Sequence, residues 1–264
     1  MGLGINCDMA VIGVLACEVL ELEIATLLGA DPKLNAIWVV KDAQSARLLS
    51  ALKKSPSAHL LQPISDMSGF NADPSLALEV VVRILELGLH NNKKTLQDAL
   101  IKAANKMAPE VNVLFLGYGL CGNALENPKN LFKDVDLPIF MPMDKDRPVD
   151  DCIALLLGGR EPYYKEQMSC AGTYYMIPGW SFHWRRMFEA EFGKVSIDLA
   201  KRLFKNYKRS LMVPTPVMTE AEMKKNAAPF SKMFNLRVES HPGTMAILER
   251  TWEEAKTFLK TNSL

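Results

Sequence analysis

Residues 9–32 read MAVIGVLACEVLELEIATLLGADP, and this stretch decides the fold class. The run from Met9 to Leu15 is apolar and short, as in a buried strand. Apolar residues then recur at helical spacing, at Leu20, Ile24, Leu27 and Leu28, until Asp31-Pro32 ends the pattern. The stretch therefore predicts a buried strand, a tight turn and a helix.

Short apolar runs recur along the chain and predict an alternation of strands and helices. Strands are expected near residues 36–40, 111–116, 138–143, 211–213 and 236–239, and residues 80–87 fit a strand or a helix. Helices are expected near residues 44–52, 93–104, 150–157, 182–208, 220–234 and 245–259, with an interruption of the fourth at Gly193. Such alternation predicts an α/β fold, a mainly parallel, Rossmann-like sheet with helices on both faces. We expect one domain over residues 1–264, with two similar lobes, 1–110 and 111–264, as its possible division.

Composition and charge argue against a nucleic-acid-binding protein, a membrane-spanning protein and a disulfide-stabilised protein. The chain has 31 basic and 30 acidic residues, and its basic residues are scattered, so no nucleic-acid partner is expected. No apolar stretch reaches the roughly 18 residues that span a bilayer, so no membrane partner is expected either. Five cysteines without short regular spacing suit a reducing cytoplasm better than a disulfide framework. An apolar helix face near Leu203 and Phe204 could be buried within one chain or in a homo-oligomer.

Three cysteines stand where a strand-like run gives way to a polar or helical start: Cys17, Cys121 and Cys152. The carboxyl ends of parallel strands converge on one crevice, so these thiols could share a site. Near helix starts the macrodipole would lower their pKa and favour thiolates, which bind Zn²⁺ or iron. His90, which ends its own apolar segment, could be a fourth ligand. The alternative is that each cysteine packs in the core as a small hydrophobe.

The turn from Gly117 to Asn123 reads GYGLCGN and follows the clearest predicted strand. It satisfies G-x-G-x-x-G, in which the backbone approaches a pyrophosphate at a helix start, and Asp144 lies about twenty residues on, where a ribose-binding acid is expected. Pro128 interrupts the helix that should follow. The turn predicts either a cofactor site made by Gly117, Gly119, Gly122 and Asn123, or a glycine turn that only needs positive φ angles.

Further candidates lie in the second half of the chain. Asp150 and Asp151 could act as acid–base groups or cap a helix, and Arg160 could hold an anion or pair with an acid. An aromatic stretch around residues 163–180 is expected to be a loop and a candidate lid, with Thr173 and Trp180 lining a cofactor pocket. Neither Cys7, Cys170 nor His183 is expected to act in the site.

Several of these segments together resemble the family catalogued as domain of unknown function 1638, over roughly residues 9–185. They are Ala16-Cys17, Leu89-His90-Asn91, the turn at 117–122, Asp151-Cys152-Ile153 with Leu157-Gly158 and Arg160, Gly172-Thr173-Tyr174 and Pro178-Gly179-Trp180. Members occur largely in anaerobic bacteria and archaea, often beside corrinoid-dependent methyltransferase systems. The family usually has His-Asp-Cys where this chain has Asp150-Asp151-Cys152, which leaves Asp150 as an oxygen ligand or a helix cap.

The resemblance implies a role around anaerobic one-carbon metabolism. Combined with the thiols, it predicts a zinc or iron protein of methyl transfer, either a metal-dependent transferase or an accessory protein, with a small-molecule ligand and a corrinoid protein or methyltransferase as partner. The competing class is a non-catalytic protein that binds a small molecule or nucleotide at the glycine turn.

Overall fold

The computed structural model describes residues 10–262. Its main sheet has six strands in the order β3-β2-β4-β1-β5-β6, and every neighbouring pair is parallel. The predicted α/β fold with a mainly parallel sheet is therefore confirmed. The strands are β1 Ala10–Cys17, β2 Ala36–Val40, β3 Leu61–Ile64, β4 Leu78–Leu85, β5 Val113–Gly117 and β6 Ile139–Phe140.

Strand β1 lies near the middle of this sheet, and all eight of its residues are buried. It pairs with β4 on one side, where Cys17 faces Leu85, and with β5 on the other, where Ala16 faces Gly117. After β1 the chain leaves towards β2, whereas after β5 it leaves towards β6. The carboxyl ends of β1 and β5 therefore flank a topological switch point, the usual ligand position in such sheets.

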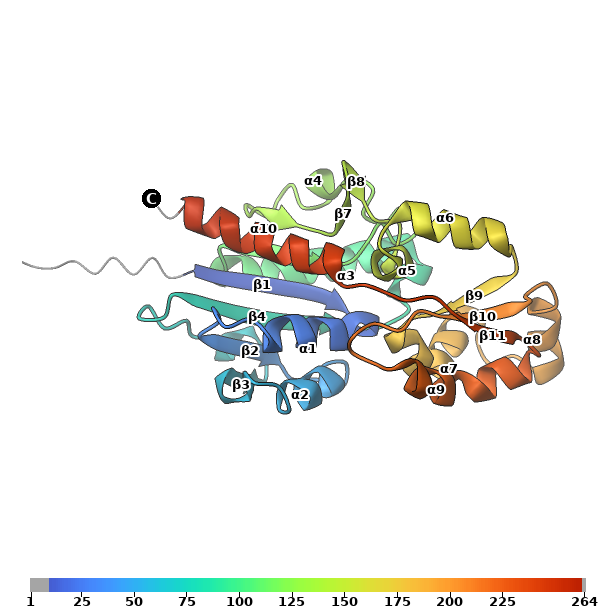
Figure 1. Ribbon diagram of the computed structural model, residues 1–264. Coiled ribbons are helices and arrows are strands. Elements are labelled where there is room, and N and C mark those ends of the chain that lie inside the picture. Colours follow the sequence, from blue (N-terminus) through green and yellow to red (C-terminus); the bar gives the residue numbers. More distant parts are fainter. Residues whose placement is uncertain (1–9, 263–264) are drawn as a thin grey trace, which may run out of the picture.

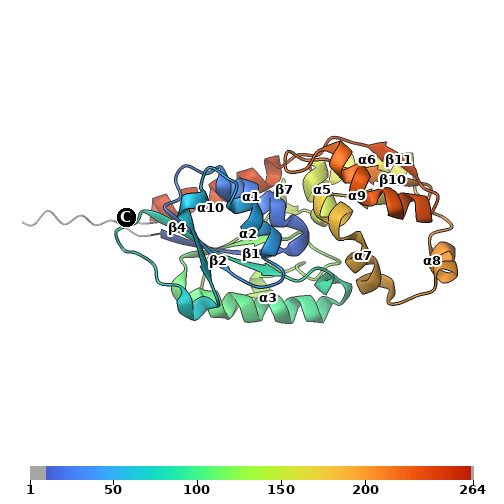
Figure 2. The same ribbon diagram turned by 90° about the horizontal axis from the view of Figure 1, so that it is seen from below.

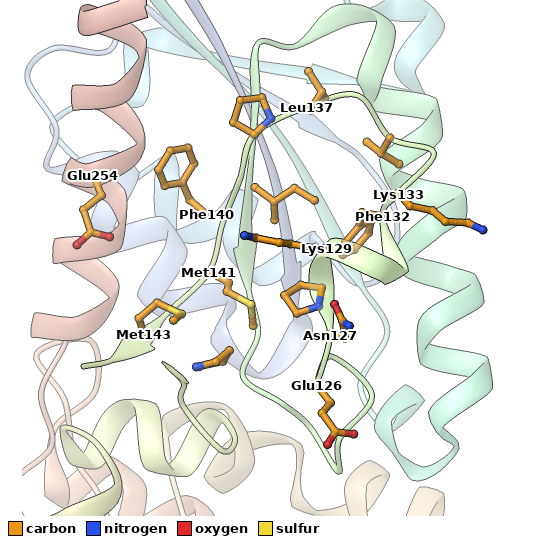
Figure 3. A pocket seen from close by; sticks show the side chains of 15 residues that line it. Glu126, Asn127, Lys129, Phe132, Lys133, Leu137, Phe140, Met141, Met143 and Glu254 are labelled. Carbon is orange, nitrogen blue, oxygen red and sulfur yellow. The ribbon is translucent and has the colours of Figure 1, made fainter. Parts of the chain in front are cut away.

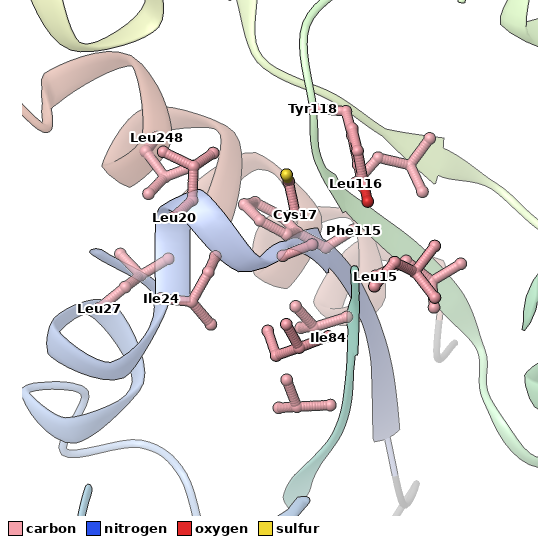
Figure 4. Close-up of a cluster of buried hydrophobic side chains, with 14 of the residues drawn as sticks. Leu15, Cys17, Leu20, Ile24, Leu27, Ile84, Phe115, Leu116, Tyr118 and Leu248 are labelled. Carbon is pink, nitrogen blue, oxygen red and sulfur yellow. The ribbon is translucent and has the colours of Figure 1, made fainter. Parts of the chain in front are cut away.

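Helices cover both faces of the main sheet. Helices α1 Glu21–Gly29, α2 Ala46–Leu52 and α10 Ala246–Asn262 lie on one face, and α3 Lys93–Met107 lies on the other (Figure 2). The apolar residues of α3 recur at helical spacing and are buried: Leu96, Leu100, Ala104 and Met107. Between β1 and α1 the side chains of Leu20, Ile24, Phe115 and Leu248 form one packed cluster (Figure 4). The core thus fixes the carboxyl end of β1.

A second, three-stranded parallel sheet lies beyond the end to which β1 points (Figure 1). Its order is β11-β10-β9, with β9 Thr173–Met176, β10 Arg209–Met212 and β11 Arg237–Ser240. Helices α7 Pro178–Phe192, α8 Ile197–Leu203 and α9 Glu220–Met233 surround an aromatic core that includes Tyr174, Trp184, Phe204 and Phe230. The chain then returns to the first sheet through α10.

Short elements connect the two sheets and fill the loops of the first. They are the 3-10 turns η1 Glu18–Leu20, η2 Ala58–Leu60, η3 Met67–Gly69, η4 Leu89–Asn91 and η5 Ala108–Glu110, the helices α4 Pro128–Leu131, α5 Cys152–Leu157 and α6 Arg160–Ser169, and the hairpin β7 Met143–Asp144 with β8 Arg147–Pro148. Within residues 10–262, no helix is both long and apolar enough to cross a membrane.

Some predicted elements are corrected. The interruption expected at Gly193 within residues 182–208 is confirmed, because Gly193, at φ 71°, ends α7, but the second helix, α8, ends at Leu203 and not at residue 208. The stretch 163–180, expected as a loop and lid, contains α6, β9 and the start of α7, and β9 is fully buried. Residues 80–87 belong mainly to β4. Strands β5 and β6 follow residue 110 yet pair within the first sheet, and the division into one domain or two lobes stays a prediction.

Candidate functional site

A small cavity lies at the switch point between β1 and β5. Its volume is about 20 Å³, enough for one water molecule or one ion. The four predicted metal ligands all line it: Cys17, Cys121, Cys152 and His90. The remaining walls are Val19, Glu86, Leu89, Leu96, Gly117, Tyr118 and Gly119. The structure therefore brings together thiols and an imidazole from four distant segments.

Each ligand candidate is held by a different element. Cys17 is the last residue of β1, and His90 lies in η4, just after β4. Cys121 lies in the turn after β5 with a positive φ of 47°, and its N–H donates to the Asp150 carbonyl at 3.0 Å. Cys152 is the first residue of α5. Figure 4 shows the Cys17 side chain at the end of β1, between α1 and the segment that carries Tyr118.

Burial governs the charge of these thiols. Burial, with a smaller contribution from the nearby carboxylates of Glu18 and Glu21, raises the pKa of Cys17 to about 12. Burial also raises the pKa of Cys121 and of Cys152 well above the usual value, and the neighbouring thiols add to both shifts. The predicted lowering of these pKa values by helix starts is therefore wrong. Desolvation outweighs the dipole, and Cys121 lies in a turn that begins no helix.

His90 is in the form that binds metals. Burial lowers the pKa of its imidazole, so the ring is neutral at pH 7. Neither ring nitrogen forms a hydrogen bond or ion pair with another residue of the described range 10–262. The predicted alternative, that His90-Asn91 caps α3, is wrong: the cap is Asn92, whose side chain accepts from the N–H of Thr95 at 3.0 Å.

Thiols and an imidazole are ligand types that bind soft metal ions, but the four side chains are not arranged around one centre as metal ligands are. Among residues 10–262, no three or more His, Cys, Asp and Glu side chains are grouped in a way that could hold a metal ion. The hydroxyl of Tyr118, beside Cys17 and Cys121, is buried without a hydrogen-bond partner. Zinc or iron binding by the thiols stays a prediction.

The glycine turn uses its backbone for internal contacts. The N–H groups of Leu120 and Cys121 donate to the carbonyls of Val149 and Asp150 at 2.8 and 3.0 Å. A Cβ on Gly119 would lie 2.6 Å from the Val149 carbonyl oxygen, so glycine is needed there for packing. Gly122 and Asn123 have φ values of 64° and 63°. These contacts favour the interpretation as a positive-φ turn over a pyrophosphate site, because two of its amides already have partners.

The predicted acid–base residues have structural partners. Asp151 caps α5 by accepting from the N–H groups of Ile153 and Ala154 at 2.9 and 2.8 Å. Asp150 accepts from Arg160 Nε at 2.9 Å. Asp144, expected to bind a ribose, accepts from the N–H of Arg160 at 2.8 Å. None of these side chains lines the cavity.

The predicted cofactor residues of the second half also lie away from the cavity. Thr173 accepts a hydrogen bond from Arg209 Nε at 2.7 Å and donates to the Cys170 carbonyl at 2.6 Å. Trp180 packs against Tyr174 with ring centroids 5.8 Å apart. Gly122 and Asn123 are likewise outside the lining, whereas Gly117 and Gly119 belong to it. Cys7 lies outside the described residues.

Sequence reasoning missed a buried ionic cluster behind Cys17. Arg186 Nη1 lies 2.5 Å from Glu18 Oε1, and His183 Nε2 lies 2.8 Å from Glu21 Oε1. Arg47 Nη1 also donates to Glu21, at 2.6 Å. Both carboxylates are almost fully buried. The acidic residues within the otherwise apolar EVLELE run were the available signal, because buried carboxylates need partners.

The family model described as "Protein of unknown function (DUF1638)" matches residues 84–252. This chain belongs to that family. The predicted resemblance is thus confirmed, and the matched range includes His90, Cys121 and Cys152, whereas Cys17 precedes it.

Comparison with other known proteins adds little to the family match. No curated protein matches the chain. A solved structure titled "AtPrR2 with NADP+ and (+)pinoresinol" is 9% identical, with 88% of this chain and 78% of that chain covered and a TM-score of 0.25. This TM-score is too low to indicate a shared fold.

Proposed function

We propose that this chain binds one thiophilic metal ion, zinc or iron, through Cys17, Cys121 and Cys152, with His90 as the fourth ligand. One observation carries the proposal: three thiols and an imidazole from four separate segments line a single cavity of about 20 Å³. That volume suits one ion and excludes an organic ligand as a whole. Its position at the switch point is where such sheets bind their ligands.

The surroundings of the thiols support a ligand role over simple core packing. A cysteine that packs as a small hydrophobe needs no imidazole beside it. Here a neutral His90 without a hydrogen-bond partner lines the same cavity, and the hydroxyl of Tyr118, another lining residue near Cys17 and Cys121, is an unsatisfied buried group. Buried polar groups normally have partners. A bound ion with its thiolates would give this polar lining the interactions that it lacks.

Binding would require the thiols to lose protons and to turn. Zinc binds sulfur at about 2.3 Å and tetrahedrally, so the side chains must rotate towards one centre. With the pKa of Cys17 near 12, the thiols are neutral until a cation stabilises their thiolates. The carboxylates of Glu18 and Glu21 lie close behind, held by Arg186 and by His183 and Arg47. These pairs limit the negative charge next to the thiolates.

The reaction class comes from the family resemblance. Members that occur beside corrinoid-dependent methyltransferases suggest methyl transfer, either as an enzyme or as an accessory protein in the cytoplasm of an anaerobe. An ion held by the three thiolates alone keeps an open position, where it would activate a thiol acceptor or water, whereas an ion that also binds His90 has four protein ligands and no open position. For methyl transfer, His90 would therefore have to leave the ion to the three thiols, and Glu86, on the cavity wall, would accept the proton of the incoming thiol. A small-molecule thiol and a corrinoid protein are the proposed partners.

Metal content tests the proposal directly. The protein is purified anaerobically, incubated with one equivalent of Zn²⁺ or Fe²⁺, desalted and analysed by elemental mass spectrometry. We expect about one ion per chain, and loss of most of it in Cys121→Ser and in Cys152→Ser. Cys170→Ser is the matched control, because Cys170 lies at the end of α6 and outside the cavity lining.

Circular dichroism melting of each variant shows whether the fold is intact. Folded wild-type protein that retains neither metal would contradict the proposal. Equal loss of metal from Cys170→Ser would contradict the assignment of the ligands.

A further inference from the structure

A larger pocket lies at the β6 edge of the first sheet, away from the thiols. Its volume is about 660 Å³, within the range of small-molecule sites. The walls come from the segment around α4, from β6 and the β7–β8 hairpin, and from Glu254 on α10 (Figure 3). It shares no lining residue with the thiol cavity. The pocket is therefore a separate site.

The lining is mostly apolar, and contacts with helix α10 hold two of its walls in place. Phe132 and Met141 are buried. Phe140 packs against Phe258 of α10 with ring centroids 5.5 Å apart, and Arg250 of α10 donates to the Met143 carbonyl. Two walls are thus fixed to one long helix, so the pocket is preformed. An apolar concavity of this size in water favours an occupant that covers it.

Two lysines line this pocket, and Lys129 is the one that projects across its apolar walls. Figure 3 shows the Lys129 side chain crossing the pocket towards Phe140 and Met141, whereas the Lys133 side chain extends in the other direction. Lys129 forms no ion pair with any residue between 10 and 262. Glu254, on the opposite wall, lies 3.8 Å from Arg250, and Glu126 lies at the end of the pocket away from Phe140 (Figure 3). An unpaired ammonium beside apolar walls is complementary to an anion with an apolar body.

We propose that this pocket binds a medium-chain carboxylate, with its carboxylate on Lys129 and its apolar chain against Phe140, Ile139 and Leu137. A second open pocket of about 550 Å³, between β4 and α3, is less suited to this ligand. Its Arg83 is already paired with Asp42 at 3.0 Å, and its Lys102 and Lys106 share the walls with the carboxylate of Asp66, which attracts Lys106. The proposal is independent of metal binding by the thiols.

Calorimetric titration with octanoate and with 1-octanol tests this proposal. We expect one octanoate per chain, and an octanoate Kd at least about tenfold higher in Lys129→Met, with the 1-octanol Kd unchanged. Lys133→Met is the comparison variant: Lys133 also lines the pocket, but its exposed side chain extends away from Phe140 and Met141 (Figure 3), so its octanoate Kd should change less than about twofold. Phe140→Ala should weaken both ligands.

Several outcomes would overturn the proposal. They are absence of octanoate binding to the folded protein, equal octanoate affinity of wild type and Lys129→Met, and equal weakening by Lys133→Met. Lys129 and Lys133 are both exposed, so both variants should fold, and melting curves check this.

Discussion

Glu23 on α1 shows at the scale of one residue how burial controls charge in this molecule. Its side chain is fully buried, and Oε1 accepts only a long hydrogen bond of 3.3 Å from Thr215, while Oε2 has no partner. Burial raises the pKa of this carboxyl to about 7. The folded protein thus holds a proton on Glu23 at pH values where the unfolded chain, with a pKa near 4.5, has lost it.

This shift predicts a pH-dependent stability. Because the folded state binds the extra proton, stability from this group is full below about pH 4.5 and is lost as pH rises through about 7. Glu23→Gln mimics the protonated form, so we expect it to be about 3 kcal/mol more stable than wild type at pH 8 but only about 1 kcal/mol more stable at pH 5. Urea unfolding at both pH values measures this.

The exposed residue Glu110 offers a control. Glu110→Gln should leave the free energy of unfolding within about 0.5 kcal/mol at either pH. A Glu23→Gln variant that is less stable than wild type by the same amount at pH 5 and pH 8 would show that Glu23 does not titrate as described.

For the residues of the cavity, the sequence predicts which side chains come together but not their protonation. The convergence of Cys17, Cys121 and Cys152 was predictable, because parallel topology places strand ends at one edge. Their protonation was not, since it depends on burial depth, which the local pattern does not contain. The capping role of Asp151 was one of two predicted alternatives, and only coordinates could show the two N–H groups that it accepts.

Helix α10 is the element that closes the first sheet. Its Lys256 is almost fully buried, with Nζ 2.5 Å from Asp31 Oδ2, and Trp252 Nε1 donates to the same oxygen at 2.7 Å. The Trp252 ring also meets Phe115 of β5 edge-on, with centroids 5.6 Å apart. One buried ion pair therefore joins the last helix to the segment that follows α1.

Removal of one partner from this pair should be costly. Lys256→Met leaves the Asp31 carboxylate buried without its counter-ion, and we expect a loss of about 3 kcal/mol in the free energy of unfolding. Lys260→Met, at an exposed position of the same helix, should change it by less than about 0.5 kcal/mol. Urea denaturation followed by tryptophan fluorescence compares them. Similar stability of the two variants would contradict the role given to the Asp31 pair.

Helices and strands were predictable where the apolar residues follow a single run or a single periodic spacing. The strand at residues 113–117 and the apolar stripe of α3 follow from runs and spacing alone. Strand β3 was missed because its two central residues, Gln62 and Pro63, are exposed and interrupt any apolar run, as suits an edge strand. Strand β9 was missed because Tyr174 and Tyr175 also suit a loop, and their place is set by pairing with β10.

At the scale of the whole molecule, the two sheets meet where α7 begins against η1. A Cβ on Gly179 would lie 2.0 Å from the Val19 carbonyl oxygen, so only glycine allows this approach. The Glu18–Arg186 and Glu21–His183 pairs join the same two segments. Residues more than 160 positions apart make these contacts, so no local sequence pattern could specify them.

This contact predicts an unusual effect of alanine. Glycine-to-alanine changes within helices normally stabilise by up to about 1 kcal/mol. Gly179→Ala should instead lower the free energy of unfolding by about 3 kcal/mol, because its Cβ would clash with the backbone of Val19, which cannot change rotamer as a side chain can. Gly69→Ala is the control, since its Cβ would meet Ile64 at ordinary distances of 3.4 and 3.5 Å. Thermal melting compares both variants, and a stabilised Gly179→Ala protein would refute the close approach.

The return of the chain through α10 has a consequence for synthesis on the ribosome. Phe115 on one face of the first sheet is covered by Trp252, which, like Leu248 of the same helix, is translated only after the whole second sheet. After β6 has been translated, more than a hundred further residues must be added before α10 can cover its part of the first sheet, and these apolar side chains stay exposed to solvent during that time. Chaperone demand should be greatest during that interval, and ribosome-bound chains that stop before residue 246 should be the ones that aggregate.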